Sequence, residues 1–389
     1  MSDNSALRAG VIGCGNVSLR RHIPTLARLP GVQLAAIADP VAARRAEALG
    51  VAGLPPEAGF DSHDQMLADA GLDYVVVAVP PATRPTILRD CFRAGLHALS
   101  EKPLALRPFE AQALIEQAAA ADLRFGMVHN YLFFPEYQEV RRRLDQGAVG
   151  QVRHVGLQFM GVPDLPGNAD YRPLWRHELG EAGGGVLMDM IHVLYVAEYL
   201  VGGPIRAVSS AIDNLGYPEG EVEDLALIRL HFDGAYATVH LGWGHGPGGV
   251  EVTGTQGRIL VFYRDFQTGP FAEVTTLTVV SPAGVEELKP DWTSTTPPTF
   301  VELHTDFAQA IRAGRPPIAP AEAGLRTLQA ALACYASAHT GKVVEIPLDS
   351  GDPLYRDGIF GLPRLQAWPG SPLQRRGLLG LGRKAGLTP

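Results

Sequence analysis

The chain has 389 residues, of which 46% are hydrophobic and 19% charged, and its formal net charge at pH 7 is −8. This length exceeds what one hydrophobic core usually serves, so we expect a soluble globular protein with two domains. The negative balance, without a basic stripe, argues against nucleic acid and anionic membranes as partners.

Cysteine usage and the N-terminal residues bear on the compartment. Cys14, Cys91 and Cys334 are widely spaced and odd in number, which fits a reducing compartment and argues against a structural metal. The first residues lack the basic and apolar regions of a secretory signal. We identify no apolar stretch of the roughly 18 residues that a membrane span needs. We therefore expect a cytoplasmic protein with no metal and no membrane partner.

The first third of the chain alternates short apolar runs with helical patterns, which is typical of βαβ units around a parallel sheet. The continuous apolar run at residues 74–79 predicts a strand covered on both faces. We predict strands at residues 8–13, 34–38, 74–79, 97–100 and 125–129, and helices at 17–29, 41–49, 86–94 and 108–121.

The pattern changes after residue 127. Consecutive strand-like runs without helices between them indicate an antiparallel sheet. The tail after residue 357 is rich in Gly, Pro and Arg, which indicates an irregular arm. We predict strands at residues 225–232, 236–242, 250–253 and 274–280, and helices at 134–146, 183–201, 300–313 and 321–339.

A glycine-rich turn follows the first predicted strand. Gly13 and Gly15 stand where a dinucleotide-binding turn needs glycine, because the backbone bends sharply there and approaches the pyrophosphate at a helix N-terminus. Ser18 takes the place of the usual third glycine. Such a pattern alone also fits an ordinary tight turn. The residues predicted to contact the cofactor here are Gly13, Cys14, Gly15, Asn16, Val17 and Ser18.

Asp39 ends the second predicted strand, 21 residues after Ser18. An acid about 20 residues after the glycine turn binds the ribose hydroxyls of NAD and disfavours the 2′-phosphate of NADP. Arg44 and Arg45 follow one helical turn later and weaken that preference. The alternative is that Asp39 is a helix N-cap. We expect NAD as the cofactor, and NADP less readily.

A lysine follows the fourth strand of the same unit, in the tripeptide Glu101-Lys102-Pro103. Oxidation of a secondary alcohol needs a base for the hydroxyl proton. Lysine serves only if its pKa is lowered, which burial and an oxidised nicotinamide both favour, whereas histidine needs little adjustment. Asp189 and His192 are three residues apart, which places them on one face of the predicted helix. Together these residues indicate redox chemistry on a bound nicotinamide.

The ordered set of motifs resembles the Gfo/Idh/MocA family of oxidoreductases over about residues 7–347. This resemblance implies an α/β Rossmann domain plus an α+β domain with a large, open, predominantly antiparallel sheet that often mediates oligomerisation. The matching parts are residues 13–18 with His22 and Pro24, the turn at 79–81, residues 95–103, residues 183–189 with His192, and residues 336–342.

The resemblance also implies the domain limits and the assembly. We predict a dinucleotide-binding Rossmann domain at residues 1–127 and an α/β substrate and oligomerisation domain at residues 128–347. Residues 348–389 then form a C-terminal arm, either mobile or laid on a neighbouring subunit. The expected assembly is a homodimer or homotetramer.

By the same resemblance, Lys102 and His192 share the acid–base work, and Asp189 orients the substrate or the histidine. We expect His192 to take the proton while Lys102 hydrogen-bonds the same oxygen. The chain departs from the family at Arg84, where a histidine is usual, and in the acid–histidine spacing, which is usually four. An arginine at position 84 would reach a phosphate or the substrate. Further expected cofactor contacts are Pro80, Arg84, Glu101, Lys102 and Asn130, and expected substrate contacts are Tyr131, Tyr171, Trp175 and Arg176.

The expected activity is that of an NAD-dependent dehydrogenase or reductase, an oxidoreductase acting on CH–OH groups. It moves hydride between nicotinamide and a ring hydroxyl or ketone of a sugar, sugar derivative or cyclic polyol. Two alternatives stay open. One is a redox-neutral glycoside-cleaving enzyme that oxidises a ring carbon, eliminates the glycoside and reduces the ketone with the same retained NAD. The other is a non-catalytic NAD-binding sensor.

Overall fold

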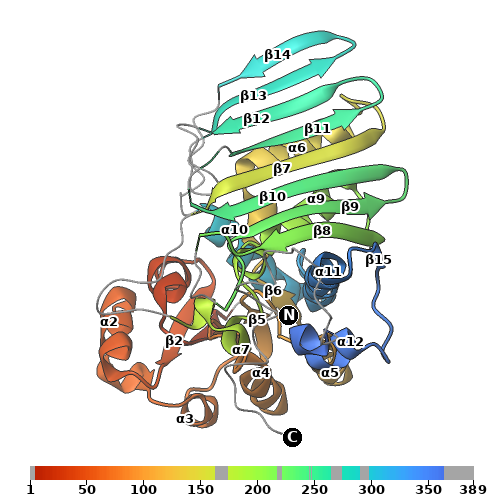
Figure 1. The fold of residues 1–389 in the computed structure, drawn as a ribbon. Helices are drawn as coiled ribbons and strands as arrows, with labels where there is room; N and C mark the ends of the chain where they lie inside the picture. The colour runs from red at the N-terminus through yellow and green to blue at the C-terminus, as the bar shows by residue number, and fades with distance from the viewer. Residues whose placement is uncertain are drawn as a thin grey trace, which may run out of the picture. The chain divides into compact units, whose positions relative to one another are not determined.

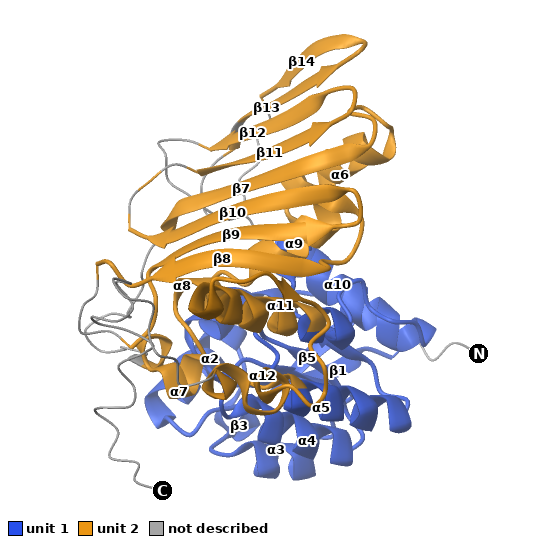
Figure 2. Ribbon diagram, turned by 45° about the vertical axis from the view of Figure 1, so that its right-hand side comes forward, with its two compact units in different colours: residues 1–105, 109–133, 297–325 blue, residues 106–108, 134–296, 326–389 orange. Residues whose placement is uncertain are grey.

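The computed structural model describes residues 5–162, 174–216, 221–244, 246, 248–263, 274–289 and 298–362. The chain divides into two compact units, each with its own sheet (Figures 1 and 2). Unit 1 comprises residues Met1–Ala105, Phe109–Phe133 and Pro297–Leu325, and unit 2 comprises Leu106–Pro108, Phe134–Thr296 and Arg326–Pro389.

The sheet of unit 1 is parallel, with the strand order β3-β2-β1-β4-β5-β6. This is the order of a doubly wound dinucleotide-binding fold. Ile12 pairs with Ala38 and Val77, and Val77 pairs with Ser100. The four strands β1, β2, β4 and β5 therefore end level with one another, at the carboxyl edge of the sheet. The strands are β1 (Leu7–Ile12), β2 (Val32–Ala38), β3 (Gly59–Phe60), β4 (Tyr74–Val77), β5 (His97–Ser100) and β6 (Phe125–Met127).

A helix from late in the chain completes the core of unit 1. The rings of Tyr74 and Phe307 meet edge to face at 5.6 Å, and Phe300 and Leu303 join the same buried cluster. Residues 297–325 thus belong to unit 1, whereas the predicted limits place them in the second domain. The helices of unit 1 are η1 (Ser18–His22), α1 (Ile23–Leu26), α2 (Ala42–Ala52), η2 (Pro56–Ala58), α3 (His63–Asp69), α4 (Arg84–Arg93), most of α5 (Pro108–Ala120), η3 (Asn130–Phe133) and α10 (Pro298–Ala313).

The sheet of unit 2 has the order β14-β13-β12-β11-β7-β10-β9-β8-β15 and is antiparallel except for the pair β7–β10. Along β9 and β10 buried residues alternate with more exposed ones, as in a sheet with one covered face. The predicted fold class is thereby confirmed. The strands are β7 (Val152–Val162), β8 (Ala207–Asp213), β9 (Leu225–Phe232), β10 (Ala235–Trp243), β11 (Gly248–Gly254), β12 (Arg258–Tyr263), β13 (Val274–Ser281), β14 (Gly284–Leu288) and β15 (Val344–Glu345).

The long helix predicted at residues 183–201 is wrong, because two short helices, α8 and α9, replace it and the preceding helix α7 ends at Ala182. Gly183 and Gly184 adopt φ values of +77° and +155°, which end the first helix, and Met190 leaves helical geometry at φ −99°, ψ 30°. The helices of unit 2 are α6 (Pro135–Asp145), η4 (Leu174–His177), α7 (Leu179–Ala182), α8 (Val186–Asp189), α9 (His192–Val201), most of α11 (Ala321–Thr340), α12 (Pro353–Asp357) and η6 (Gly358–Gly361).

The expectation that no segment has the length and composition of a membrane span is wrong for this region. Leu179–Val201 is the one stretch of the described residues that is long and apolar enough, and 78% of its 18-residue window is buried inside the protein. Burial and the two helix breaks indicate a core segment of unit 2. At the end of the chain, α12 and η6 open the predicted C-terminal arm, whose residues 363–389 lie outside the described part.

Because the carboxyl group of Glu136 in α6 is buried, we expect the stability of the protein to depend on pH. The residue is fully buried, and neither carboxylate oxygen hydrogen-bonds to another described residue. Burial raises the pKa of Glu136 from 4.5 to about 7. The folded state therefore holds this proton to higher pH than the unfolded state, and stability falls as pH rises from about 4.5 to about 7. Above that window the free energy of unfolding is lower by about 3 kcal/mol.

Glu136→Gln is expected to remove this pH dependence, so that at pH 8 the variant unfolds at higher urea concentration than the wild type. At pH 5 the two proteins are expected to be similar. Glu139→Gln is the matched control, since Glu139 lies in the same helix but its carboxylate pairs with Arg142 and Arg143. The prediction is contradicted if the urea midpoint of Glu136→Gln changes between pH 5 and pH 8 by as much as that of the wild type.

Candidate functional site

The turn after β1 is held by a glycine and a serine. Gly13 has φ +93°, and a Cβ there would lie 2.5 Å from the carbonyl oxygen of Ala78, so only glycine fits. The buried hydroxyl of Ser18 donates to the Gly13 carbonyl oxygen at 2.6 Å. Serine thus keeps the small volume expected of the third glycine and also fixes the turn.

The helix that follows presents backbone amides at its first turn. Val17 already has helical dihedrals, and the Leu19 amide donates to the Gly15 carbonyl at 3.0 Å. The amides before Leu19 belong to a first helical turn, which offers them no intrahelical acceptor. Asn16, Val17 and Ser18 therefore carry the donors that suit a pyrophosphate.

Asp39 connects this turn to the end of β2. One carboxylate oxygen accepts from the Cys14 amide and the other from the Val41 amide, both at 2.8 Å. The N-cap of α2 is Val41, so the alternative role of Asp39 as that cap is wrong. Each carboxylate oxygen can accept a second hydrogen bond. Asp39 is therefore held in place and still able to bind ribose hydroxyls, which is the fit expected for NAD.

Asp39→Asn is expected to raise the KM for NAD⁺ about tenfold and to shift selectivity toward NADP⁺, because a neutral amide accepts fewer hydrogen bonds and no longer repels a 2′-phosphate. The measurement is a comparison of kcat/KM for the two cofactors. Glu47→Gln is the matched control, since it removes the same charge from an exposed position of α2. Unchanged selectivity in Asp39→Asn would contradict the assignment.

Arg84 begins α4 and binds the turn after β4 in a way that the sequence did not predict. Its buried guanidinium donates from Nη1 to the Pro103 carbonyl and from Nη2 to the Val79 carbonyl, the latter at 2.5 Å. Burial lowers the pKa of Arg84 to about 10, although the charge of Glu101 opposes this shift. The expected contact with a phosphate or substrate is therefore replaced by a link between the segments that follow β4 and β5.

Glu101 and Lys102 follow β5 at the carboxyl edge. The Lys102 amide donates to Glu101 Oε2 at 3.0 Å, and Glu101 Oε1 lies 3.2 Å from His22 Nε2. Burial raises the pKa of Glu101, but the hydrogen bond from His22 and the charges of His22, Lys102 and Arg84 outweigh it, so the pKa is lowered. An ionised carboxylate therefore binds the backbone amide of Lys102.

The remaining predicted residues of unit 1 also lie at this edge. Pro80 belongs to the turn after β4, where its carbonyl accepts from the Thr83 amide at 3.2 Å. Asn130 and Tyr131 begin η3 after β6, and Tyr131 is buried. The sheet thereby brings the glycine turn, Asp39 and Lys102 to one edge of unit 1.

In unit 2 a buried carboxylate holds the triple glycine. Glu223 accepts from the amides of Gly185 and Leu187 at 2.8 and 2.9 Å and from the Tyr335 hydroxyl at 2.8 Å. A Cβ on Gly184 would lie 1.9 Å from the Tyr335 hydroxyl, and one on Gly185 would lie 1.9 Å from the Glu223 carbonyl oxygen. Neither Glu223 nor Tyr335 was predicted, because no local pattern connects them to the glycines.

This arrangement positions the candidate catalytic residues of unit 2. Asp189 ends α8, and its Oδ1 lies 3.4 Å from Nε of Arg176, whose guanidinium also lies over the Trp175 ring at 4.8 Å. His192 begins α9, is buried, and has Nδ1 2.5 Å from the Tyr195 hydroxyl. The two residues are on different helices, so the shared helix face expected for Asp189 and His192 is wrong. The predicted substrate contact Tyr171 lies outside the described residues.

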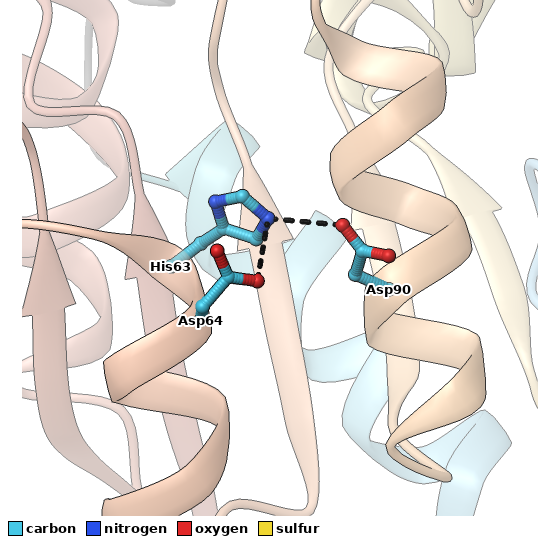
Figure 3. Close-up of side chains that lie close together, drawn as sticks. All are labelled: His63, Asp64 and Asp90. Carbon is cyan, nitrogen blue, oxygen red and sulfur yellow. Dashed lines mark hydrogen bonds and ion pairs between the residues drawn. The ribbon is translucent and has the colours of Figure 1, made fainter.

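A separate cluster at the start of α3 joins it to α4. His63 Nε2 lies 3.1 Å from Asp90 and 3.4 Å from Asp64 (Figure 3). Asp90 also pairs with Arg93 at 3.0 Å. Such groups are potential metal ligands. Since the carboxylates already pair with the imidazole and a guanidinium, we interpret the cluster as a link between two helices.

Comparison with protein families decides the identity of the chain. Residues 7–129 match the oxidoreductase family with an NAD-binding Rossmann fold, and residues 137–260 match the GFO/IDH/MocA C-terminal domain. The chain belongs to the Gfo/Idh/MocA family. It is accordingly an oxidoreductase of the NAD(P)-dependent class that acts on CH–OH groups, with a Rossmann domain for NAD.

Two curated relatives illustrate the range of this family. The dTDP-3,4-didehydro-2,6-dideoxy-alpha-D-glucose 3-reductase of Streptomyces violaceoruber is 31% identical over 52% of this chain and 56% of its own length. The scyllo-inositol 2-dehydrogenase (NAD(+)) of Bacillus subtilis is 25% identical over 87% of this chain and 96% of its own. This chain therefore spans about half the length of the first relative and nearly all of the second.

A solved structure supports the fold of the Gfo/Idh/MocA chain. The oxidoreductase from Agrobacterium radiobacter in complex with NAD⁺, L-tartaric acid and magnesium is 20% identical, with a TM-score of 0.77 over 88% of this chain and 99% of that one. At this identity the likeness concerns the fold.

Proposed function

We propose that this member of the Gfo/Idh/MocA family is an NAD-dependent dehydrogenase or reductase of a sugar, sugar derivative or cyclic polyol. The observation that carries the proposal is the carboxyl edge of the parallel sheet, where the register aligns the glycine turn, Asp39 and Lys102. The names of the relatives, a reductase of a dTDP-linked deoxysugar and an inositol dehydrogenase, support the substrate class.

In the proposed reaction, NAD supplies the acceptor of the hydride that leaves the carbinol carbon. The glycine turn binds the pyrophosphate, and Asp39 binds the adenosine ribose. His192 takes the hydroxyl proton in the oxidative direction and returns it to the ketone oxygen in the reverse direction. Lys102 hydrogen-bonds the same oxygen and polarises it. The charge of Asp189, balanced by Arg176, orients the substrate or His192.

We further propose a cytoplasmic homodimer or homotetramer. The exposed face of the unit 2 sheet carries Leu227, Tyr236 and Phe262, which are 39%, 51% and 48% exposed. The strand register places these three side chains on one face, and an apolar sheet face of this kind suits an interface between identical subunits. The three cysteines are free and buried, in keeping with a reducing compartment.

The test is a panel of sugars, sugar derivatives and inositols with NAD⁺ or NADP⁺, followed by the appearance of reduced nicotinamide. Oxidation of at least one compound, abolished in His192→Ala, is the expected result. A redox-neutral glycoside-cleaving enzyme instead retains NAD after purification and cleaves an aryl glycoside without net NADH. Binding of NAD without turnover of any compound would favour a sensor and refute the proposal.

A further inference from the structure

Three buried ionisable side chains of unit 1 form a hydrogen-bonded row that ends at the backbone amide of Lys102. His304, from α10, approaches His22 with 3.0 Å between its Nε2 and Nδ1 of His22. Nε2 of His22 lies 3.2 Å from Glu101 Oε1, and Glu101 Oε2 accepts from the Lys102 amide at 3.0 Å. His22 and His304 are fully buried and Glu101 is 7% exposed. The row thus runs from α10 through η1 to the backbone of Lys102.

The proton positions in this row follow from its chemistry. Ionised Glu101 only accepts hydrogen bonds, so His22 Nε2 carries the proton between them. His22 Nδ1 and His304 Nε2 share the next hydrogen bond, in which one ring donates and the other accepts. His304 Nδ1 is buried and has no hydrogen-bond partner among the described residues. The Glu101 carboxylate therefore accepts from His22 on one side and from the Lys102 amide on the other.

The surroundings favour this arrangement. Burial, reinforced by the charge of His22, lowers the pKa of His304 well below 6.5, so His304 is neutral. The ring of Phe300 meets His22 edge to face at 5.2 Å. The charged groups that act on Glu101 are His22 from η1, Arg84 from α4 and the neighbouring Lys102. A low-dielectric enclosure strengthens a fully aligned row of hydrogen bonds and penalises any break in it.

We propose that His22 and His304 are positioning residues for Lys102: through Glu101 they fix the backbone from which the Lys102 side chain projects. This inference rests on the proposed catalytic role of Lys102. A displacement of about 1 Å at a reacting group can cost up to about 100-fold in rate. The hydrogen bond that His304 makes to His22 therefore influences the reaction, although His304 does not touch the substrate.

Two variants of His304 separate positioning from packing. His304→Gln retains a polar group that can donate to His22 Nδ1 or accept from it, but it buries a second amide atom without a partner, which costs stability. His304→Leu fills the apolar surroundings but removes the hydrogen bond to His22. Positioning predicts that His304→Leu loses about tenfold or more in kcat while His304→Gln stays close to wild type. The KM for NAD⁺ is expected to stay unchanged in both variants. The unfolding midpoints are expected to rank in the opposite order.

A second readout needs no turnover. The rate of reductive methylation of Lys102, measured by mass spectrometry, reports how firmly its amine is held. The expected result is several-fold faster labelling of Lys102 in His304→Leu and in Glu101→Gln than in wild type or His304→Gln. Lys289 and Lys342, on unit 2, are internal controls whose labelling should not change.

The two readouts also separate this inference from the proposed function. If wild type oxidises no polyol, the proposed function fails, while faster labelling in His304→Leu still supports the positioning role. If wild type is active but His304→Leu matches it in kcat and in Lys102 labelling, the positioning role is refuted. The positioning role is also refuted if His304→Gln and His304→Leu lose the same amount of activity, or if their activities follow the order of their unfolding midpoints.

Discussion

Lys102→Ala is expected to lower kcat about 10²–10⁴-fold, the range that a positioned acid–base group contributes. The alanine variant loses the group that polarises the substrate oxygen, while the Glu101 carboxylate still accepts from the backbone amide of residue 102. The pyrophosphate turn and Asp39 do not depend on this side chain, so the Kd for NADH is expected to stay unchanged. Steady-state kinetics on the best polyol and fluorescence titration of NADH measure the two quantities.

The matched control is Lys342→Ala, which removes an exposed lysine that follows α11 and is expected to leave kcat unchanged. Lys102→Arg adds a second comparison, since it keeps the positive charge but replaces a compact ammonium by a planar fork. Activity of Lys102→Ala equal to that of wild type would overturn the catalytic assignment. A parallel loss of NADH binding would instead indicate a role in holding the cofactor.

The parts of the fold that repeat a local pattern were predictable from the sequence. The strands at residues 97–100 and 225–232 are confirmed as β5 and β9. In β9 the apolar pattern reports directly that one face of the strand is covered. The glycine turn and Asp39 also lie close together as expected, since both follow ends of neighbouring parallel strands. In these cases the signal is contained within a few consecutive residues.

Contacts between distant residues were not predictable. Glu223 reaches Gly185 across 38 positions, and His304 reaches His22 across 282. Nothing in the neighbouring sequence of either residue marks it as a partner. Arg84 was misinterpreted for a related reason: its sequence position suggested a ligand, whereas the carbonyls that it binds come from the turn after β4 and, 19 residues away, from Pro103.

The helix interruption near Asp189 and His192 shows how two explanations of a glycine run compete. From the sequence, the triple glycine and the apolar run after it predict a single helix over residues 183–201. In the structure, the glycines are required because Glu223 and Tyr335 occupy the space that side chains would need. The spacing of three between Asp189 and His192 consequently spans a break, and α8 and α9 orient the two residues separately.

Gly185→Ala is therefore expected to destabilise the protein by about 3 kcal/mol, the upper end of the usual range for overpacking a buried site. Its Cβ would lie 1.9 Å from the backbone carbonyl oxygen of Glu223, which a side-chain rotation cannot relieve. The same displacement would disturb the hydrogen bond from the Gly185 amide to Glu223 and move α8, so activity should fall with stability. Urea unfolding and kcat measure the two effects.

Gly180→Ala is the matched control, since Gly180 lies in α7 and a Cβ there meets nothing within 4 Å. Alanine at that site is expected to stabilise by about 0.4–1 kcal/mol, because it restricts the unfolded chain. Comparable stability of Gly185→Ala and Gly180→Ala would mean that Glu223 can move away at little cost. In that event the buried carboxylate would not be what holds α8, and the position of Asp189 would need another cause.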